Sequence, residues 1–263
     1  MKRLFLALIT LLVAHTSFGA TAMNIHTERV DYNDGDTPLQ GYLAYDQAQT
    51  GKRPGVIVVH EWTGEGAYVD RRARQLAELG YVAFAIDIYG KGVRPANQQE
   101  AGEQAGKYRK DVPLMRERAE AGLKVLQANP LVDTSRIAAM GYCFGGGVAL
   151  EMARNGDPLA GVVSFHGSLH TPNPQDTKTV KCKILVLHGA DDPTVPMVDI
   201  EAFTKEMNDA GADWQFVAYS HTRHGFTNPD NGTDNTKSVA YNKESDERSW
   251  QAMKDFFHEI FKP

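Results

Sequence analysis

The fold of this chain is decided by the stretch Gly141-Tyr142-Cys143-Phe144-Gly145-Gly146-Gly147. It follows the apolar run 136–140 and opens a helical pattern over 146–154. A chain that turns sharply from a strand into a helix needs small residues around the turn, and it presents the apex residue clear of the sheet. The helix N-terminus behind Cys143 favours a thiolate. The stretch predicts a nucleophile elbow at Cys143; the alternative is a buried structural cysteine beside packing glycines.

Short apolar runs alternate with helical patterns on both sides of this stretch. The runs that predict buried strands are 56–59, 81–86, 136–140, 161–165, 184–187 and 214–219, and the helical patterns are 68–79, 114–128, 146–154, 198–210 and 245–261. This alternation predicts a mostly parallel α/β sheet with helices on both faces. Two earlier runs, 26–32 and 39–45, predict an antiparallel edge. The polar, glycine-containing stretch 90–111 follows a strand, at the end of the sheet where ligands bind.

A nucleophile on such an elbow is followed along the chain by an acid and then by a histidine. The loop 188–196 offers Asp192, which we expect to accept a hydrogen bond from the imidazole and hold its tautomer. Its neighbour Asp191 is the competing candidate. The base is predicted to be His224. His221 and His224 also suggest a metal pair, but no Cys, Asp or Glu at ligand spacing accompanies them, so no metal or other cofactor is expected.

The loop after the run 56–60 carries a second carboxylate. Glu61 leaves the sheet at the end where Cys143 is expected, and the alternative is a solvent-facing loop acid. The same loop normally supplies the second backbone amide of an oxyanion hole, here from Trp62. The first amide is expected from Phe144, which directly follows the nucleophile.

Together these motifs resemble the dienelactone hydrolase family, which includes carboxymethylenebutenolidases. The resemblance covers residue 41 to the C-terminus and rests on Gly141–Gly146, Val59–Trp62, Asp87–Gly90, the Asp192 loop and His224–Phe226. It implies an α/β-hydrolase fold and a Cys143–His224–Asp192 triad that cleaves esters or lactones through a thioester. It also implies that Glu61 contacts the nucleophile and controls its charge state.

The sequence departs from the family at two positions that bind a substrate carboxylate. The family's arginines are replaced by Lys91, a point charge rather than a bidentate fork, and by Asn228, which is neutral. Arg94 and Arg223 are the candidates to compensate. We therefore expect neutral esters or lactones to be preferred over carboxylated dienelactones. A general short-chain carboxylesterase and a peptidase-like hydrolase of the same fold stay open as alternatives.

The N-terminal residues are typical of a bacterial signal peptide. Lys2 and Arg3 precede the apolar run 4–13, and Ala20-Thr21-Ala22 places small residues at a cleavage site. We expect residues 1–22 to be removed, leaving one domain, 23–263, that is periplasmic or secreted and monomeric. Loss of the two basic residues takes the net charge from −5 to −7. No basic run remains, which argues against nucleic acid or an anionic membrane as a partner and leaves a small-molecule ester or lactone.

Two cysteines occur, Cys143 and Cys182. A reversible disulfide between them would make the chain a thiol-based redox or binding protein. However, Cys182 begins a predicted strand and Cys143 ends another. In a parallel sheet those ends are farther apart than the roughly 7 Å between Cα atoms that a disulfide spans. Two free thiols are therefore expected.

Overall fold

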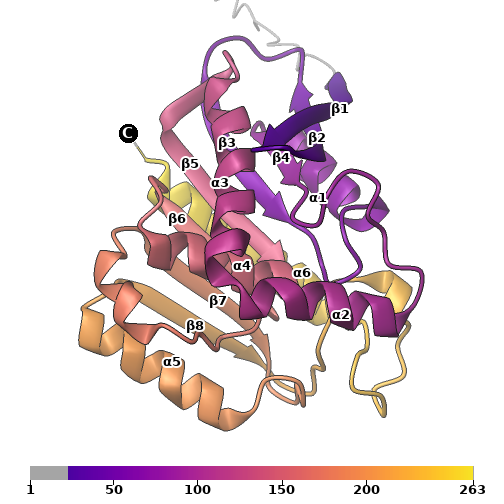
Figure 1. Ribbon diagram of the computed structural model, residues 1–263, viewed down its shortest axis with the longest axis vertical. Helices are drawn as coiled ribbons and strands as arrows, with labels where there is room; N and C mark the ends of the chain where they lie inside the picture. Colours follow the sequence, from indigo (N-terminus) through magenta and orange to yellow (C-terminus); the bar gives the residue numbers. More distant parts are fainter. Residues whose placement is uncertain (1–22, 263) are drawn as a thin grey trace, which may run out of the picture.

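The computed structural model describes residues 23–262, which form one eight-stranded sheet (Figure 1). The strand order is β1-β2-β4-β3-β5-β6-β7-β8; β2 is antiparallel to both neighbours and the remaining pairs are parallel. The strands are β1 (Ile25–Asp34), β2 (Thr37–Asp46), β3 (Arg53–Val59), β4 (Val82–Ile86), β5 (Val132–Tyr142), β6 (Gly161–Phe165), β7 (Lys183–Gly189) and β8 (Trp214–Tyr219). The predicted mostly parallel α/β-hydrolase sheet is confirmed, and β1 and β2 form its antiparallel edge.

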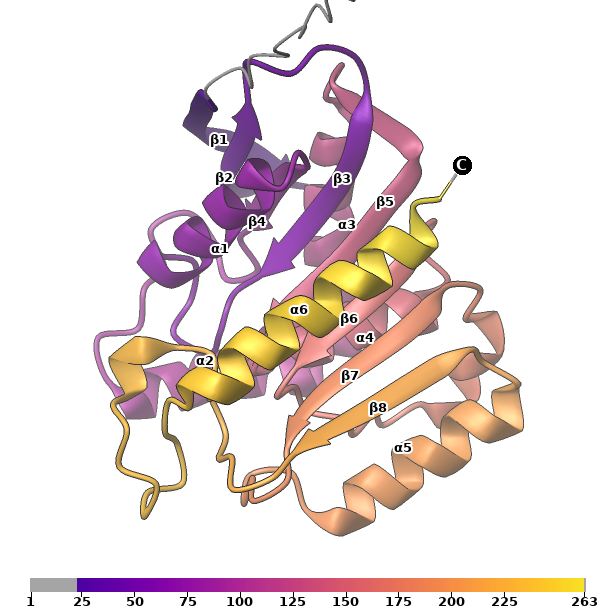
Figure 2. The same cartoon turned by 180° about the vertical axis from the view of Figure 1, so that it is seen from behind.

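Helices cover both faces of the sheet. They are α1 (Ala67–Glu78), α2 (Gln98–Lys110), α3 (Val112–Ala128), α4 (Phe144–Asn155), α5 (Met197–Ala210) and α6 (Lys243–Ile260). One buried apolar cluster joins α2, α3, α4 and α5 to the face seen in Figure 1. A second joins α1 and α6 to the opposite face, where α6 crosses the strands (Figure 2). The sheet thus lies between two layers of helices.

The helix α2 was not predicted from the sequence, in which residues 90–111 stand out only as a polar stretch. Its side chains are mainly polar or charged, and three of its residues are buried, Ala101, Ala105 and Tyr108. Such a narrow apolar stripe gives a weak helical period. The capping pattern was the available signal, because the Asn97 side chain accepts a hydrogen bond from the Glu100 amide at 2.9 Å.

The register of the parallel strands brings several loops to one edge of the sheet. Gly141 of β5 pairs with Val59 of β3, and Tyr142 pairs with Phe165 at the end of β6. Phe165 in turn pairs with Leu187 of β7. The loops that follow these strands therefore leave the sheet side by side, which is where this class of fold places its ligand site.

The expected signal peptide, residues 1–22, lies outside the described residues. Between Met23 and Lys262, no helix combines the length and the hydropathy needed to cross a membrane.

Candidate active site

Cys143 occupies the apex of a tight turn between β5 and α4. Its backbone angles, φ 54° and ψ −115°, are unusual for a residue with a side chain. The flanking glycines leave no room for larger residues: a Cβ on Gly141 would lie 2.0 Å from the Gly145 oxygen, and one on Gly145 would lie 2.3 Å from the Val59 oxygen. The turn therefore holds a strained backbone that projects the thiol away from the sheet.

The thiol faces a cavity of about 610 Å³. The sequence-predicted residues that line it are Glu61, Trp62, Cys143, His224 and Asn228. They come from the loops after β3, β5 and β8, which the sheet register places together. The cavity is large enough for a drug-sized ligand.

The imidazole of His224 is buried beside the carboxylate of Asp192. Its Nδ1 donates to Asp192 Oδ2 at 2.8 Å. The other carboxylate oxygen, Oδ1, accepts from the Thr194 amide at 2.8 Å and from the Thr194 hydroxyl at 2.7 Å. With three donors, Asp192 is held firmly, and it fixes the ring so that Nε2 is left for the cavity.

These contacts raise the pKa of His224 and lower the pKa of Asp192, so both groups favour their charged forms. Burial opposes the charged imidazolium, but the negative charge of Cys143 and the hydrogen bond to Asp192 outweigh it and raise the pKa of His224 to about 10. Burial likewise opposes the carboxylate, yet the bonds from His224 and Thr194 lower the pKa of Asp192 to about 2. The site therefore stabilises a charged pair, the His224 imidazolium and the Asp192 carboxylate, next to Cys143.

The competing acid, Asp191, lies in different surroundings. Its side chain is 45% exposed, and its carboxylate is 3.9 Å from Nδ1 of His221. The structure brings Asp192, not Asp191, to His224.

Glu61 and Trp62 line the same cavity as Cys143. The Glu61 carboxylate accepts from Asn228 Nδ2 at 2.9 Å. Burial raises the pKa of Glu61, although the Asn228 hydrogen bond and the charge of His224 act against it. The Trp62 carbonyl accepts from the Tyr89 hydroxyl at 2.9 Å, which fixes the loop.

Of the predicted substrate-binding residues, the structure brings only Asn228 to the cavity. Lys91 pairs with Asp31 at 2.5 Å and Arg94 with Glu65 at 2.6 Å, and neither lines the cavity. The structure thus places both cations away from the cavity, and a carboxylate of the protein engages each of them. Arg223, the other suggested substitute, donates to the Asp191 carbonyl at 3.0 Å.

The cation that does line the cavity is Arg109 of α2. Its guanidinium carbon lies 5.7 Å from the centre of the Phe144 ring. Among the described residues it makes no ion pair. Arg109 was not predicted from the sequence because the helix that carries it has only a weak apolar period.

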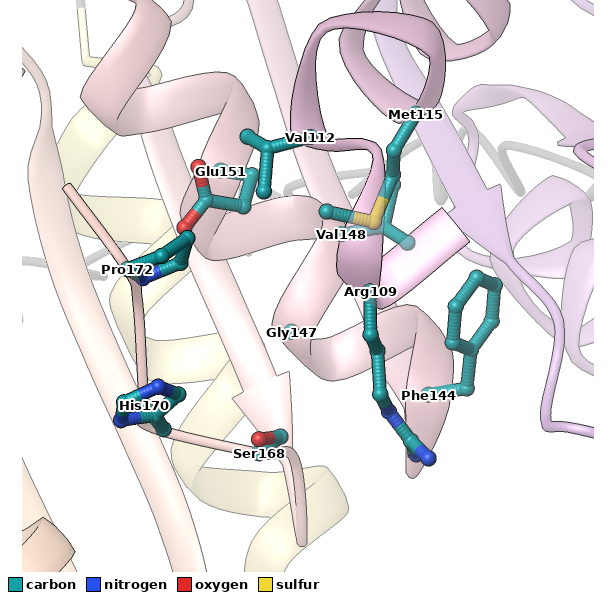
Figure 3. A pocket seen from close by; sticks show the side chains of 10 residues that line it. All are labelled: Arg109, Val112, Met115, Phe144, Gly147, Val148, Glu151, Ser168, His170 and Pro172. Carbon is teal, nitrogen blue, oxygen red and sulfur yellow. The ribbon is translucent and has the colours of Figure 1, made fainter. Parts of the chain in front are cut away.

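A small side cavity of about 60 Å³ adjoins the larger one (Figure 3). Val112, Met115 and Val148 give it apolar walls. Arg109 and Ser168 line both cavities. Figure 3 shows the Arg109 side chain between Ser168 and Phe144, which also line the small cavity.

A second residue missed from the sequence is His166. It is fully buried, has a φ of 40°, and accepts a hydrogen bond from the Cys143 amide at its Nδ1, at 3.1 Å. Its position directly after β6 was the available signal, since the polar side chains of this site follow strand ends.

Both cysteines are free thiols, with Cys143 half-buried and Cys182 buried directly before β7. Within residues 23–262, no group of three His, Cys, Asp or Glu side chains is placed to hold a metal ion.

Comparison with known proteins identifies the family. The model of the dienelactone hydrolase family matches residues 39–261. The chain is 38% identical to a solved structure named m3DLH, covering 90% of this chain and 99% of that one with a TM-score of 0.87. It is 37% identical to a dienelactone hydrolase-like promiscuous phosphotriesterase from metagenomic libraries, with the same coverage and a TM-score of 0.85. A protein of Yersinia pestis, provisionally named carboxymethylenebutenolidase, is 27% identical over 89% of this chain and 90% of its own length. The chain belongs to the dienelactone hydrolase family and is a hydrolase of esters or lactones.

Proposed function

We propose that Cys143 is the nucleophile of this hydrolase, with His224 as its base and Asp192 as the residue that orients the base. The observation that carries the proposal is the His224–Asp192 pair, joined at 2.8 Å, in the cavity that Cys143 lines. A nucleophile, a base and a third group that orients the base form the arrangement needed for covalent acyl transfer.

In the resting site His224 holds the proton taken from the Cys143 thiol, and the reaction begins when the thiolate attacks the acyl carbonyl carbon. The tetrahedral intermediate collapses by breaking the bond to the alkoxide, which takes a proton from His224 and leaves as an alcohol. The acyl group stays on sulfur as a thioester. His224 then takes a proton from water, and the resulting hydroxide attacks the thioester carbonyl carbon. The C–S bond breaks, the carboxylic acid is released, and the Cys143 thiolate is left beside the protonated His224.

The backbone amides of Phe144 and Trp62 donate to the developing oxyanion. One such donor contributes about 3–4 kcal/mol to transition-state stabilisation. Glu61 helps to control the charge state of Cys143, a role supported by its place in the cavity that Cys143 also lines. Asn228 holds Glu61 through the bond to Oε2.

The proposed substrates are neutral esters or lactones. Asn228 faces the cavity with a neutral amide, and Lys91 is paired with Asp31 away from it. A general short-chain carboxylesterase or a peptidase-like enzyme uses the same chemistry on other acyl groups. A second candidate activity, phosphotriester hydrolysis, is favoured by the 37% identity to a promiscuous phosphotriesterase, since phosphotriesters are also neutral.

We also propose that the enzyme acts outside the cytoplasm, in the periplasm or the medium. The support is the sequence of residues 1–22, with its basic start, apolar run and Ala20-Thr21-Ala22 site. The intact mass of exported protein would place the cleavage site.

The test compares Cys143→Ala and Cys182→Ala on a panel of p-nitrophenyl esters, lactones and a p-nitrophenyl phosphotriester. Cys143→Ala is expected to abolish turnover, and Cys182→Ala, the matched control, is expected to retain it. Iodoacetamide should inactivate the wild type and label Cys143 before Cys182. Full activity in a folded Cys143→Ala enzyme would contradict the proposal. The kcat/KM values of the wild type across the panel rank esters, lactones and the phosphotriester as substrates.

A further inference from the structure

His166 links the two loops that carry the proposed nucleophile and base. Its Nδ1 accepts the Cys143 backbone N–H, so the ring is the tautomer that carries its proton on Nε2. This Nε2–H donates to the Thr227 hydroxyl at 2.8 Å. Thr227 stands three residues after His224 on the same loop. One buried side chain therefore spans from the turn at Cys143 to the loop of the base.

Thr227 is held from the other side by α1. Its hydroxyl lies 2.6 Å from the Tyr68 hydroxyl, and its carbonyl accepts from Arg72 Nη2 at 2.7 Å. Arg72 is 5% exposed and pairs with Asp246 at 2.5 Å. The backbone and the side chain of Thr227 are thus both fixed, which makes it a rigid anchor for His166.

The surroundings of His166 favour the neutral ring that this arrangement needs. Burial and the positive charge of His224 hold the pKa of His166 well below its usual value. The two rings meet edge to face, with centroids 5.1 Å apart. A protonated Nδ1 cannot accept the Cys143 N–H. The ring therefore keeps its lone pair directed at the nucleophile's backbone while the neighbouring imidazole carries the charge.

We infer that His166 is a positioning residue for the hydrolysis, which fixes the strained backbone of Cys143 relative to His224 through Thr227. The inference rests on the proposed function and adds to it a residue that does not touch the substrate. Without the ring, the Cys143 amide keeps its bond to the Phe165 carbonyl at 3.0 Å, so the fold is retained while the orientation is loosened. A displacement of about 1 Å at a reacting group costs on the order of 100-fold in rate.

The experiment compares His166→Phe, which keeps a ring but no acceptor, with His166→Asn, whose amide oxygen replaces Nδ1. His166→Phe is expected to lower kcat about 100-fold with little change in KM. His166→Asn is expected to recover part of that loss. Rates are taken per thiol titrated with iodoacetamide, which separates misplacement from a smaller folded fraction. His258→Phe, at an exposed position of α6, is the matched control.

A second pair of variants tests the anchor without changing the ring. Thr227→Val removes the hydroxyl at nearly constant volume, and Thr227→Ser keeps it. Thr227→Val is expected to lower kcat more than Thr227→Ser does. Circular dichroism and the thiol count check that both variants are folded. Equal kcat per titrated thiol in wild type and His166→Phe, or equal losses in Thr227→Val and Thr227→Ser, would overturn the inference while the proposed function stands. Turnover by the wild type that resists iodoacetamide would overturn both.

Discussion

At the scale of single residues, the structure gives two adjacent aspartates different surroundings. Asp192 is buried against His224, whereas Asp191 is exposed near His221. Asp192→Asn is expected to lower kcat by about 10⁴-fold, because the amide favours the wrong imidazole tautomer. Steady-state assays of both purified variants make the comparison.

Asp191→Asn serves as the matched control for this change. It removes the neighbouring charge but no contact with His224, so its effect on kcat is expected to be small. The opposite ranking of the two variants would assign the role of the orienting acid to Asp191.

At the scale of elements, α2 places a cation at the cavity in which we propose that substrate binds. Arg109 lines both cavities, and the guanidinium–carboxylate bond of a bound anion is worth about 1.5–3 kcal/mol. We predict that Arg109→Leu lowers kcat/KM for a carboxylated dienelactone by about 10- to 100-fold and leaves a neutral aryl ester much less affected. The ratio of the two kcat/KM values, measured on one preparation, is the readout.

Lys110, the next residue, provides the control on the same helix. It is exposed and lines neither cavity, so Lys110→Leu changes the net charge equally without changing the site. A drop of the same size in both variants would mean that long-range charge, not contact with Arg109, attracts the anion.

Some elements and site residues could be predicted from the sequence, and others could not. The central strands were predictable because runs such as 56–59 and 184–187 are apolar at every position. The turn at Cys143 was predictable because its glycines are adjacent to Cys143 in the sequence. Arg109 and His166 were not, since each reaches the site only through packing between segments far apart in the chain. The positions of Lys91 and Arg94 away from the cavity were not predictable for the same reason, because their partners, Asp31 and Glu65, are set by the tertiary fold.

At the scale of the whole molecule, the site contributes to stability against acid. Asp192 has a pKa of about 2 in the fold against 3.8 for the ordinary group, so it binds a proton more readily when unfolded. Its contribution, about 2 kcal/mol, is therefore complete above pH 4 and is lost as the pH falls toward 2.

This contribution is measurable as a difference between two proteins. The free energies of unfolding of wild type and Asp192→Asn, from urea titrations, should converge by about 2 kcal/mol as the pH is lowered from 6 to 2. Most of the convergence is expected below pH 4. A gap that stays constant with pH would contradict the lowered pKa of Asp192.

The order of the strands has a consequence for when the enzyme becomes active during its synthesis. Cys143 follows β5 in the middle of the sheet, whereas His224 follows β8, the strand at the sheet's edge and the last of the chain. A nascent or truncated chain that stops before β8 thus carries the thiol without its histidine. On the proposed mechanism, the enzyme can turn over substrate only after the final strand has docked, so almost the entire polypeptide must be synthesised first.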